Sequence, residues 1–134
     1  MFPARPGRGS SRFWRQVRRG AGGDDGRHRG STNDGTMILE HACLDVRPGE
    51  ETCFEQSFAV AQGIIASMPG FASLRLERCV EQPSRYLRLV EWERLEDHTE
   101  GFRGSPRFGE WRRLLHHFYD PFPVVEHYET VLTA

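Results

Sequence analysis

The segment that most constrains the fold is residues 85–92, RYLRLVEW, in which apolar residues occupy both sets of alternate positions. Successive side chains of a β-strand point to opposite faces of a sheet, so the two sets define two faces. Because both faces carry apolar groups, we predict a strand in a sheet that is covered on both sides. One face holds Leu87, Leu89 and Glu91, and the other holds Tyr86, Arg88, Val90 and Trp92.

Two helical segments are predicted after this strand. Leu95, His98 and Phe102 follow an i, i+3, i+7 spacing, which places them on one face of a short helix and directs His98 inward. The pair Ser105-Pro106 then starts a second helix, because serine caps free backbone N–H groups and proline fits the first helical position. The hydrophobic face of the second helix consists of Phe108, Trp111, Leu115 and Phe118.

The remaining hydrophobic segments complete an alternating order of strands and helices. We predict further strands at 38–46, 71–80 and 124–132, and the link 81–84 is short enough to form a hairpin. The resulting order, β-α-β-β-α-β, is that of the α+β ferredoxin-like fold, a split βαβ unit with an antiparallel sheet and its helices on one face. The first helix is predicted to begin at Glu50 and to bury Phe54, Phe58, Ala61, Ile65 and Met68.

Helices on one face leave the apolar residues of the opposite face uncovered. Such a sheet would expose more contiguous hydrophobic surface than the few hundred Å² that monomers usually show. We therefore predict a homodimer in which two sheets pack face to face.

The first 36 residues differ in composition from the rest of the 134-residue chain. They hold eight of the 14 glycines and eight of the 18 arginines, with three acidic residues and no apolar periodicity. We predict that this segment is disordered and that translation starts at Met37. The alternatives are a basic arm for targeting or nucleic-acid binding and an unspecified linker. The predicted domain, 37–134, keeps ten Arg and 16 acidic residues, a charge of −6 that would repel nucleic acid.

Cysteine usage and hydropathy indicate the compartment. Cys43, Cys53 and Cys79 form no CxxC pair, and their odd number favours reduced thiols in the cytoplasm. No apolar run approaches the roughly 18 residues of a membrane span, so no membrane contact is expected. His116 and His117 are adjacent and point in different directions on a helix, so no metal site is predicted.

The order of elements and four short motifs resemble the antibiotic-biosynthesis monooxygenase family between Met37 and about Leu132. This resemblance implies a dimeric α+β barrel that oxidises an electron-rich aromatic, such as an anthrone, hydroquinone or phenol, to a quinone. The expected oxidant is O₂, without metal, flavin or haem. The motifs are Val90-Glu91-Trp92-Glu93 at the end of a strand, the helix with His98, the start Ser105-Pro106-Arg107-Phe108, and His127-Tyr128 in the last strand.

That chemistry requires a base and a group that stabilises an anion, because O₂ accepts an electron more readily from a phenolate than from a neutral phenol. Proton transfer from a phenol with a pKa of about 10 to an ordinary histidine with a pKa of about 6.5 is unfavourable by roughly 5 kcal/mol. A lone histidine is therefore insufficient. We predict His98 as the base and Arg88 or Tyr86 as the stabilising group. The predicted substrate contacts are Trp92, Phe102, Trp111 and His127, the last also a second candidate base.

Structural roles compete with these assignments. His98, Trp92 and Trp111 could serve only as core residues, and Arg88 could form a cross-strand ion pair with Glu77, Glu91 or Glu126. Haem-degrading relatives use an asparagine, and residues 37–134 contain none, which disfavours that function. A non-catalytic dimer of the same fold, acting in small-ligand binding or stress response, remains the alternative function.

Overall fold

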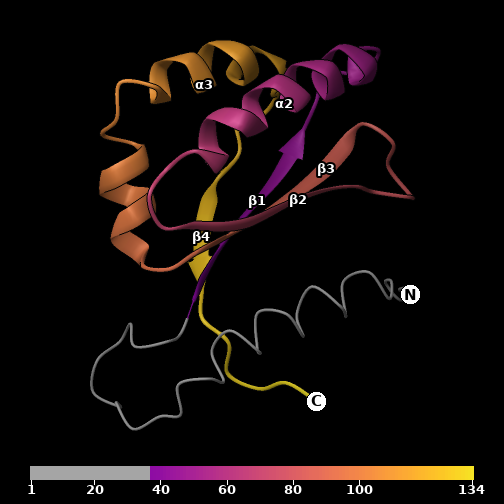
Figure 1. Ribbon diagram of the computed structural model, residues 1–134. Coiled ribbons are helices and arrows are strands. Elements are labelled where there is room, and N and C mark those ends of the chain that lie inside the picture. Colours follow the sequence, from indigo (N-terminus) through magenta and orange to yellow (C-terminus); the bar gives the residue numbers. More distant parts are fainter. Residues whose placement is uncertain (1–36) are drawn as a thin grey trace, which may run out of the picture.

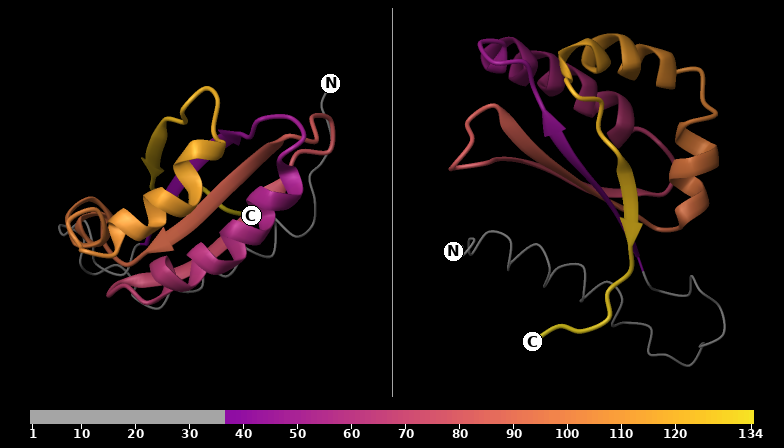
Figure 2. Two further views of the ribbon diagram at one scale, coloured as in Figure 1. Left: turned by 90° about the horizontal axis from the view of Figure 1, so that it is seen from above. Right: turned by 180° about the vertical axis from the view of Figure 1, so that it is seen from behind.

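The computed structural model describes residues 37–134, and the predictions for residues 1–36 lie outside this range. Its four strands form one antiparallel sheet in the order β2-β3-β1-β4, with the helices stacked on one face (Figures 1 and 2). The predicted α+β ferredoxin-like fold is therefore confirmed, and the sheet of the single chain stays open. The main elements are β1 (Ile38–Asp45), α2 (Glu51–Ala66), β2 (Phe71–Arg78), β3 (Arg85–Trp92), α3 (Phe108–Leu115) and β4 (Val125–Tyr128).

Strand β3 occupies the predicted residues and lies at the centre of the sheet, between β2 and β1. Its register with β1 pairs Val90 with Glu40 and Arg88 with Ala42. Residues paired in this way point to the same face, so Glu40 and Arg88 both lie on the helix side. The core on that side includes Ala42, Leu44, Phe54, Phe58, Ile65, Tyr86, Val90, Trp92, Phe102, Trp111 and Leu115.

Helix α2 forms because its apolar residues recur at alternating spacings of four and three, and Glu51 lies favourably in the first turn. It buries Phe54, Phe58, Ala61 and Ile65 as predicted, while Met68 packs at the border of the core. The turn into β2 passes through Gly70, whose φ of +85° favours glycine.

The segments after β3 differ most from the sequence-based expectation. The segment after β3 is a π-helix, η1 (Asp97–Phe102), closed by an i→i+5 bond from the N–H of Arg103 to the carbonyl of His98. Its wider turn buries His98 and Phe102 but leaves Leu95 38% exposed, so the predicted three-residue face was wrong at Leu95.

The second helix begins later than predicted: its first regular residue is Phe108, its N-cap residue is Arg107 and no side chain among the described residues caps it. The hydroxyl of Ser105 accepts the N–H of Arg107 at 3.2 Å in the turn that precedes the helix. The helix ends in a 3₁₀ turn, η2 (His116–Phe118). Strand β4 is shorter than predicted, and the chain after Tyr128 runs beyond the sheet without a strand partner among the described residues (Figure 1).

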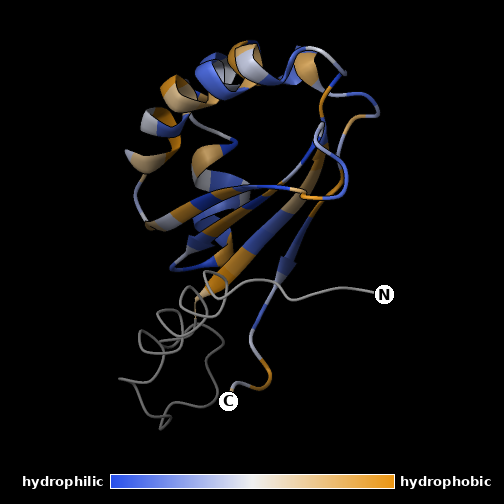
Figure 3. Cartoon of the chain, turned by 90° about the vertical axis from the view of Figure 1, so that its right-hand side faces the viewer, coloured by the Kyte–Doolittle hydropathy of each residue, from blue (hydrophilic) through white to orange (hydrophobic). Residues whose placement is uncertain are grey.

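The face of the sheet opposite the helices has a second, smaller apolar cluster. Leu39 of β1 and Leu89 of β3 form its centre, and Met37 and Leu87 pack against them. Hydrophobic and hydrophilic segments are interspersed along the strands of the sheet (Figure 3). Among residues 37–134, no helix combines the length and hydrophobicity of a membrane span.

Candidate active site

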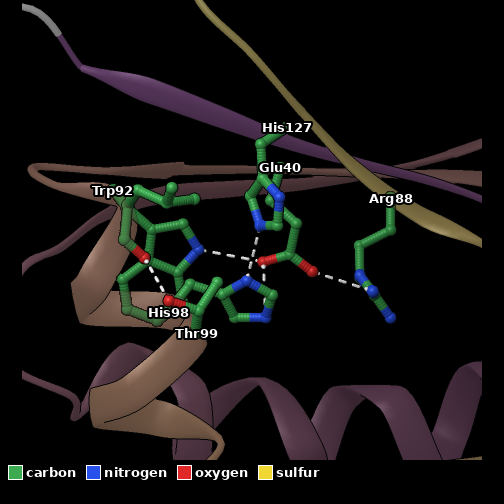
Figure 4. Close-up of polar contacts among 7 residues, drawn as sticks. Glu40, Arg88, Trp92, His98, Thr99 and His127 are labelled. Atoms are coloured by element: carbon green, nitrogen blue, oxygen red, sulfur yellow. Dashed lines mark hydrogen bonds and ion pairs between the residues drawn. The ribbon is translucent and has the colours of Figure 1, made fainter.

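Glu40 lies at the centre of a buried polar cluster on the helix side of the sheet (Figure 4). It is 1% exposed, and each of its two oxygens has a donor. Oε1 accepts the indole N–H of Trp92 at 2.9 Å, and Oε2 accepts an N–H of Arg88 at 2.8 Å. Since β1 and β3 hold all three residues, the antiparallel register fixes this arrangement.

Two histidines from different elements extend the cluster. Nε2 of His98, from η1, lies 3.5 Å from Oε1 of Glu40, and Nδ1 of His98 lies 2.8 Å from Nε2 of His127. His127 enters from the edge strand β4, where its register partner is Glu40 itself. The Glu40 carboxylate favours a proton on Nε2 of His98. Nδ1 of His98 is then unprotonated and accepts the N–H on Nε2 of His127. The result is a continuous row, Glu40–His98–His127.

Burial and charge set the protonation states of this row. Burial opposes ionisation of Glu40, but Arg88, His98 and Trp92 together outweigh it and hold its pKa below the ordinary value. Burial lowers the pKa of His98 to about 4, against the opposing attraction of Glu40. Burial also lowers the pKa of His127. Near neutral pH the row therefore holds an ionised carboxylate and two neutral imidazoles.

Aromatic rings surround the polar cluster. The imidazole of His98 stacks on the indole of Trp92, with ring centroids 5.4 Å apart and planes at 22°. Phe102 meets Trp111 edge to face at 5.4 Å, and the guanidinium of Arg88 lies 5.6 Å from the Trp111 ring centroid. The apolar surroundings lower the local dielectric, which strengthens the interactions among the charged groups.

Six of the seven predicted site residues meet in this region: Arg88, Trp92, His98, Phe102, Trp111 and His127. Tyr86 does not join them. Its hydroxyl donates to Glu55 of α2 at 2.5 Å, and its ring packs on Phe54 at 4.8 Å. Although Tyr86 shares the helix-side face with Arg88, its hydroxyl is committed to this separate contact.

The predicted ion-pair partners of Arg88 were wrong. Glu77, Glu91 and Glu126 align with Leu87, Leu39 and His41 of the outer face, whereas Arg88 points to the helix side. Glu40 was therefore the site residue that sequence reasoning missed. A signal was present, because the period-2 pattern of 38–46 places Glu40 among inward residues such as Ile38 and Ala42.

Between Met37 and Ala134, no group of three or more His, Cys, Asp or Glu side chains is arranged to hold a metal ion. The donors that do meet, Glu40, His98 and His127, instead contact one another and Trp92.

Comparison with known proteins agrees with this fold. Residues 37–114 match the model of the antibiotic biosynthesis monooxygenase family. The chain is 52% identical over 95 residues to the uncharacterized protein YczJ of Bacillus subtilis (strain 168), covering 71% of this chain and all of that protein.

Solved structures give the same result. A Bordetella bronchiseptica protein that carries the family's description superposes with a TM-score of 0.69 at 37% identity, covering 72% of this chain and 99% of its own. SnoaB of Streptomyces nogalater is described as a cofactor-independent oxygenase. It superposes with a TM-score of 0.58 at 19% identity, covering 74% of this chain and 95% of its own, which shows a shared fold. From the family match and these relatives together, the chain belongs to the antibiotic biosynthesis monooxygenase family.

Proposed function

We propose that this protein is a cofactor-independent monooxygenase that oxidises an electron-rich aromatic alcohol, such as a quinol, anthrone or phenol, to a quinone with O₂. The observation that carries the proposal is the buried row Glu40–His98–His127 beside the Arg88 guanidinium. It places a proton acceptor and a cation in one water-poor region, which are the two groups that the reaction needs. The family description and the cofactor-independent oxygenase SnoaB support the reaction class.

The reaction balances without an external reductant. A phenol and O₂ give a quinone and one water, and a quinol and O₂ give a hydroxyquinone and one water. In both reactions one oxygen atom is added to the ring, and the other leaves with two hydrogens of the substrate. All four electrons that O₂ takes up come from the aromatic ring. The protein's task is then to remove the phenolic proton, since the anion transfers an electron to O₂ more readily, and to stabilise the resulting charge.

Within the row, we assign proton uptake to His127 and a positioning role to His98. Both ring nitrogens of His98 face protein groups, Glu40 and His127. No hydrogen bond from another described residue engages Nδ1 of His127. His127 is also only partly buried, on the edge strand, so a substrate reaches it more easily. An imidazolium at His127 would be stabilised through His98 by the Glu40 carboxylate.

The magnitudes show why Arg88 is needed. Burial lowers the pKa of His127 below its ordinary value of about 6.5, so proton transfer to it from a phenol of pKa about 10 is unfavourable by more than about 5 kcal/mol. Attraction between an imidazolium and a phenolate about 4 Å apart returns about 4 kcal/mol at an intermediate dielectric. A hydrogen bond from a charged donor such as Arg88 adds about 2 to 3 kcal/mol. Together these interactions offset most of the cost, whereas the histidine alone does not.

We also propose that the protein acts as a homodimer whose sheets pack through the outer face. The Leu39–Leu89 cluster lies on this face. In the segment after β4, Val131 is 84% exposed and Leu132 is 87% exposed. Two buried polar atoms on that face, Oε2 of Glu91 and Nδ1 of His41, have no partner among the described residues. A second sheet would cover the leucines and could supply these partners. We place the dimer in the cytoplasm, since the described cysteines are unpaired.

The test is an oxygen-dependent assay on a panel of anthrones, naphthols and hydroquinones. Protein and compound are mixed without oxygen, air is admitted, and quinone absorbance and O₂ uptake are followed against buffer alone. We expect accelerated quinone formation for at least one compound, with one O₂ consumed per quinone from an anthrone or naphthol. Binding of panel members without any acceleration would instead support the non-catalytic, ligand-binding alternative.

A further inference from the structure

The position of η1 decides whether His98 reaches the buried row. Nε2 of His98 lies 3.5 Å from a carboxylate oxygen of Glu40, and Nδ1 lies 2.8 Å from Nε2 of His127. A hydrogen bond is lost beyond about 3.5 Å, so a backbone shift of about 1 Å would break the contact with His127. The row therefore requires that η1 is held in place.

The winding of η1 does not supply this restraint by itself. Its i→i+5 bond runs from the N–H of Arg103 to the carbonyl of His98. Among residues 37–134, no side chain caps its N-terminus. A π-turn of this kind is rare, so contacts outside the turn must favour it over an α-helix.

The N-terminal end of η1 is held by Asp97. Oδ2 of Asp97 accepts the backbone N–H of Arg94 at 3.1 Å, and Oδ1 lies 3.4 Å from the Arg94 guanidinium. The same carboxylate packs against Gly70, where a Cβ would overlap it. The carbonyl of Gly70 also accepts the N–H of Glu93 at 2.8 Å, which joins the turn before β2 to the link after β3. Asp97 therefore anchors η1 to two neighbouring turns.

The C-terminal end of η1 closes at Gly104, whose N–H donates to the carbonyl of Glu100 at 3.0 Å. The N–H of Arg103 points to the same carbonyl. A Cβ on Gly104 would lie 2.6 Å from that oxygen, so the backbone would have to move. A Cβ on Gly101 would come no closer than 3.7 Å to the carbonyl oxygen of Glu96, an ordinary contact. Of these two glycines, only Gly104 is required by the local geometry.

We infer that Asp97 and Gly104 are positioning residues that hold His98 in the row from the two ends of η1. Between these ends, Phe102 packs edge to face on Phe108 and Trp111, with ring centroids 5.1 and 5.4 Å away. One anchored ring restrains a single point of η1 and does not fix its rotation, for which the two ends are needed. The effect on catalysis rests on the proposed function, whereas the effect on the position of His98 does not.

The test follows the ring proton shared by the two histidines, using NMR on the isotope-labelled full-length protein near neutral pH. A ring N–H that is buried in a hydrogen bond exchanges slowly with water and gives a separate downfield signal. The signal is assigned by its loss in His127→Gln. We expect it in the unmodified protein and expect its loss in Asp97→Ala and in Gly104→Ala. Gly101→Ala and Glu96→Ala, in the same segment, are the matched controls and should keep it.

Folding is checked in the same spectra. The indole N–H of Trp92 donates to Glu40 across two strands, so its signal should persist wherever the sheet is intact. Asp97→Ala adds no atoms and removes only the anchoring contact, so it decides the outcome if Gly104→Ala does not fold. With a substrate from the panel, both variants should lower kcat by about tenfold to a hundredfold and leave KM unchanged, because a misplaced proton acceptor affects the chemical step.

The contrary results are equally specific. A ring N–H signal that is absent from the unmodified protein, or retained in Asp97→Ala or in a folded Gly104→Ala, would overturn the inference. Its loss in either control would do the same, since any change in η1 would then release His98. Because the NMR measurement needs neither substrate nor O₂, the expected losses with no quinone formation on the panel would overturn the oxygenase proposal and leave the positioning role standing.

Discussion

Glu40 of β1 and Trp92 of β3 are joined by a buried hydrogen bond of 2.9 Å from the indole N–H to the carboxylate. The two residues are 52 positions apart in the sequence and both are almost fully buried. The bond fixes the indole on which His98 stacks and leaves the other carboxylate oxygen to Arg88. One carboxylate therefore orients the aromatic, basic and cationic parts of the site together.

The first prediction concerns the buried Glu40–Arg88 pair. Glu40→Ala should lower the free energy of unfolding by about 3 to 5 kcal/mol, because it leaves the Arg88 charge buried without a partner. Urea unfolding followed by tryptophan fluorescence measures this loss. The double variant Glu40→Leu with Arg88→Met should recover most of it, since no charge then remains to be compensated.

The control for this experiment is the pair Asp45–Arg85, which joins the same two strands at 2.8 Å but is partly exposed. Asp45→Ala should cost less than about 1 kcal/mol, as expected for a solvated ion pair. Equal losses for Glu40→Ala and Asp45→Ala would contradict the central role assigned to Glu40.

The second prediction is a fall in stability at mildly acidic pH. The pKa of His98 is about 4 in the folded protein and near 6.5 when unfolded, so above about pH 6.5 both states are neutral and His98 has no effect. As the pH falls from about 6.5 to about 4, the unfolded chain binds the proton first, and stability should drop by about 3 kcal/mol. Burial lowers the pKa values of His127 and His116 as well, which adds to the loss in the same window.

Urea unfolding at about pH 7.5 and about pH 5 tests this dependence. His98→Gln should reduce the difference between the two values by about 2 kcal/mol, because the buried group no longer titrates. His117→Gln, at an exposed position, should keep the difference of the unmodified protein. A pH dependence that His98→Gln leaves intact would show that other groups cause it. Arg88 and Arg103, the cations near His98, and Glu40 opposite it remain in place in both variants.

The third prediction concerns catalysis by the histidine row. With a substrate found in the panel assay, His127→Asn and His98→Asn should each lower kcat/KM by about a hundredfold, the usual contribution of a general base. Because the two residues act as one unit, the double variant should be little worse than either single one. His117→Asn serves as the control. Full activity in His127→Asn would remove this residue as the proton acceptor and return the role to His98.

The fourth prediction addresses the open face of the sheet. Sedimentation velocity should show a dimer for the unmodified protein and a monomer for Leu89→Arg, which places a charge in the outer-face cluster. Val60→Arg is the matched control, since Val60 lies on α2 and is 63% exposed. It should remain dimeric. A monomeric unmodified protein would refute the proposed face-to-face assembly.

Local sequence patterns predicted most of the elements correctly. The alternation in 85–92 predicted strand β3 with the same bounds as in the structure. The spacing of Phe54, Phe58, Ala61 and Ile65 predicted the buried face of α2. The prediction was weaker where backbone winding departs from a regular helix, as in η1, because a three-and-four spacing assumes 3.6 residues per turn.

By itself, the sequence determined which residues face inward, because side-chain direction depends only on the period of the local backbone. That was sufficient for the ferredoxin-like fold and for placing Arg88, Trp92 and His98 in the interior. Only the tertiary structure decided which inward residues meet. Strand register and the approach of η1 and β4 bring Glu40, Arg88, His98 and His127 into one cluster. Such contacts depend on packing between segments that are distant in the chain, which local periodicity does not encode.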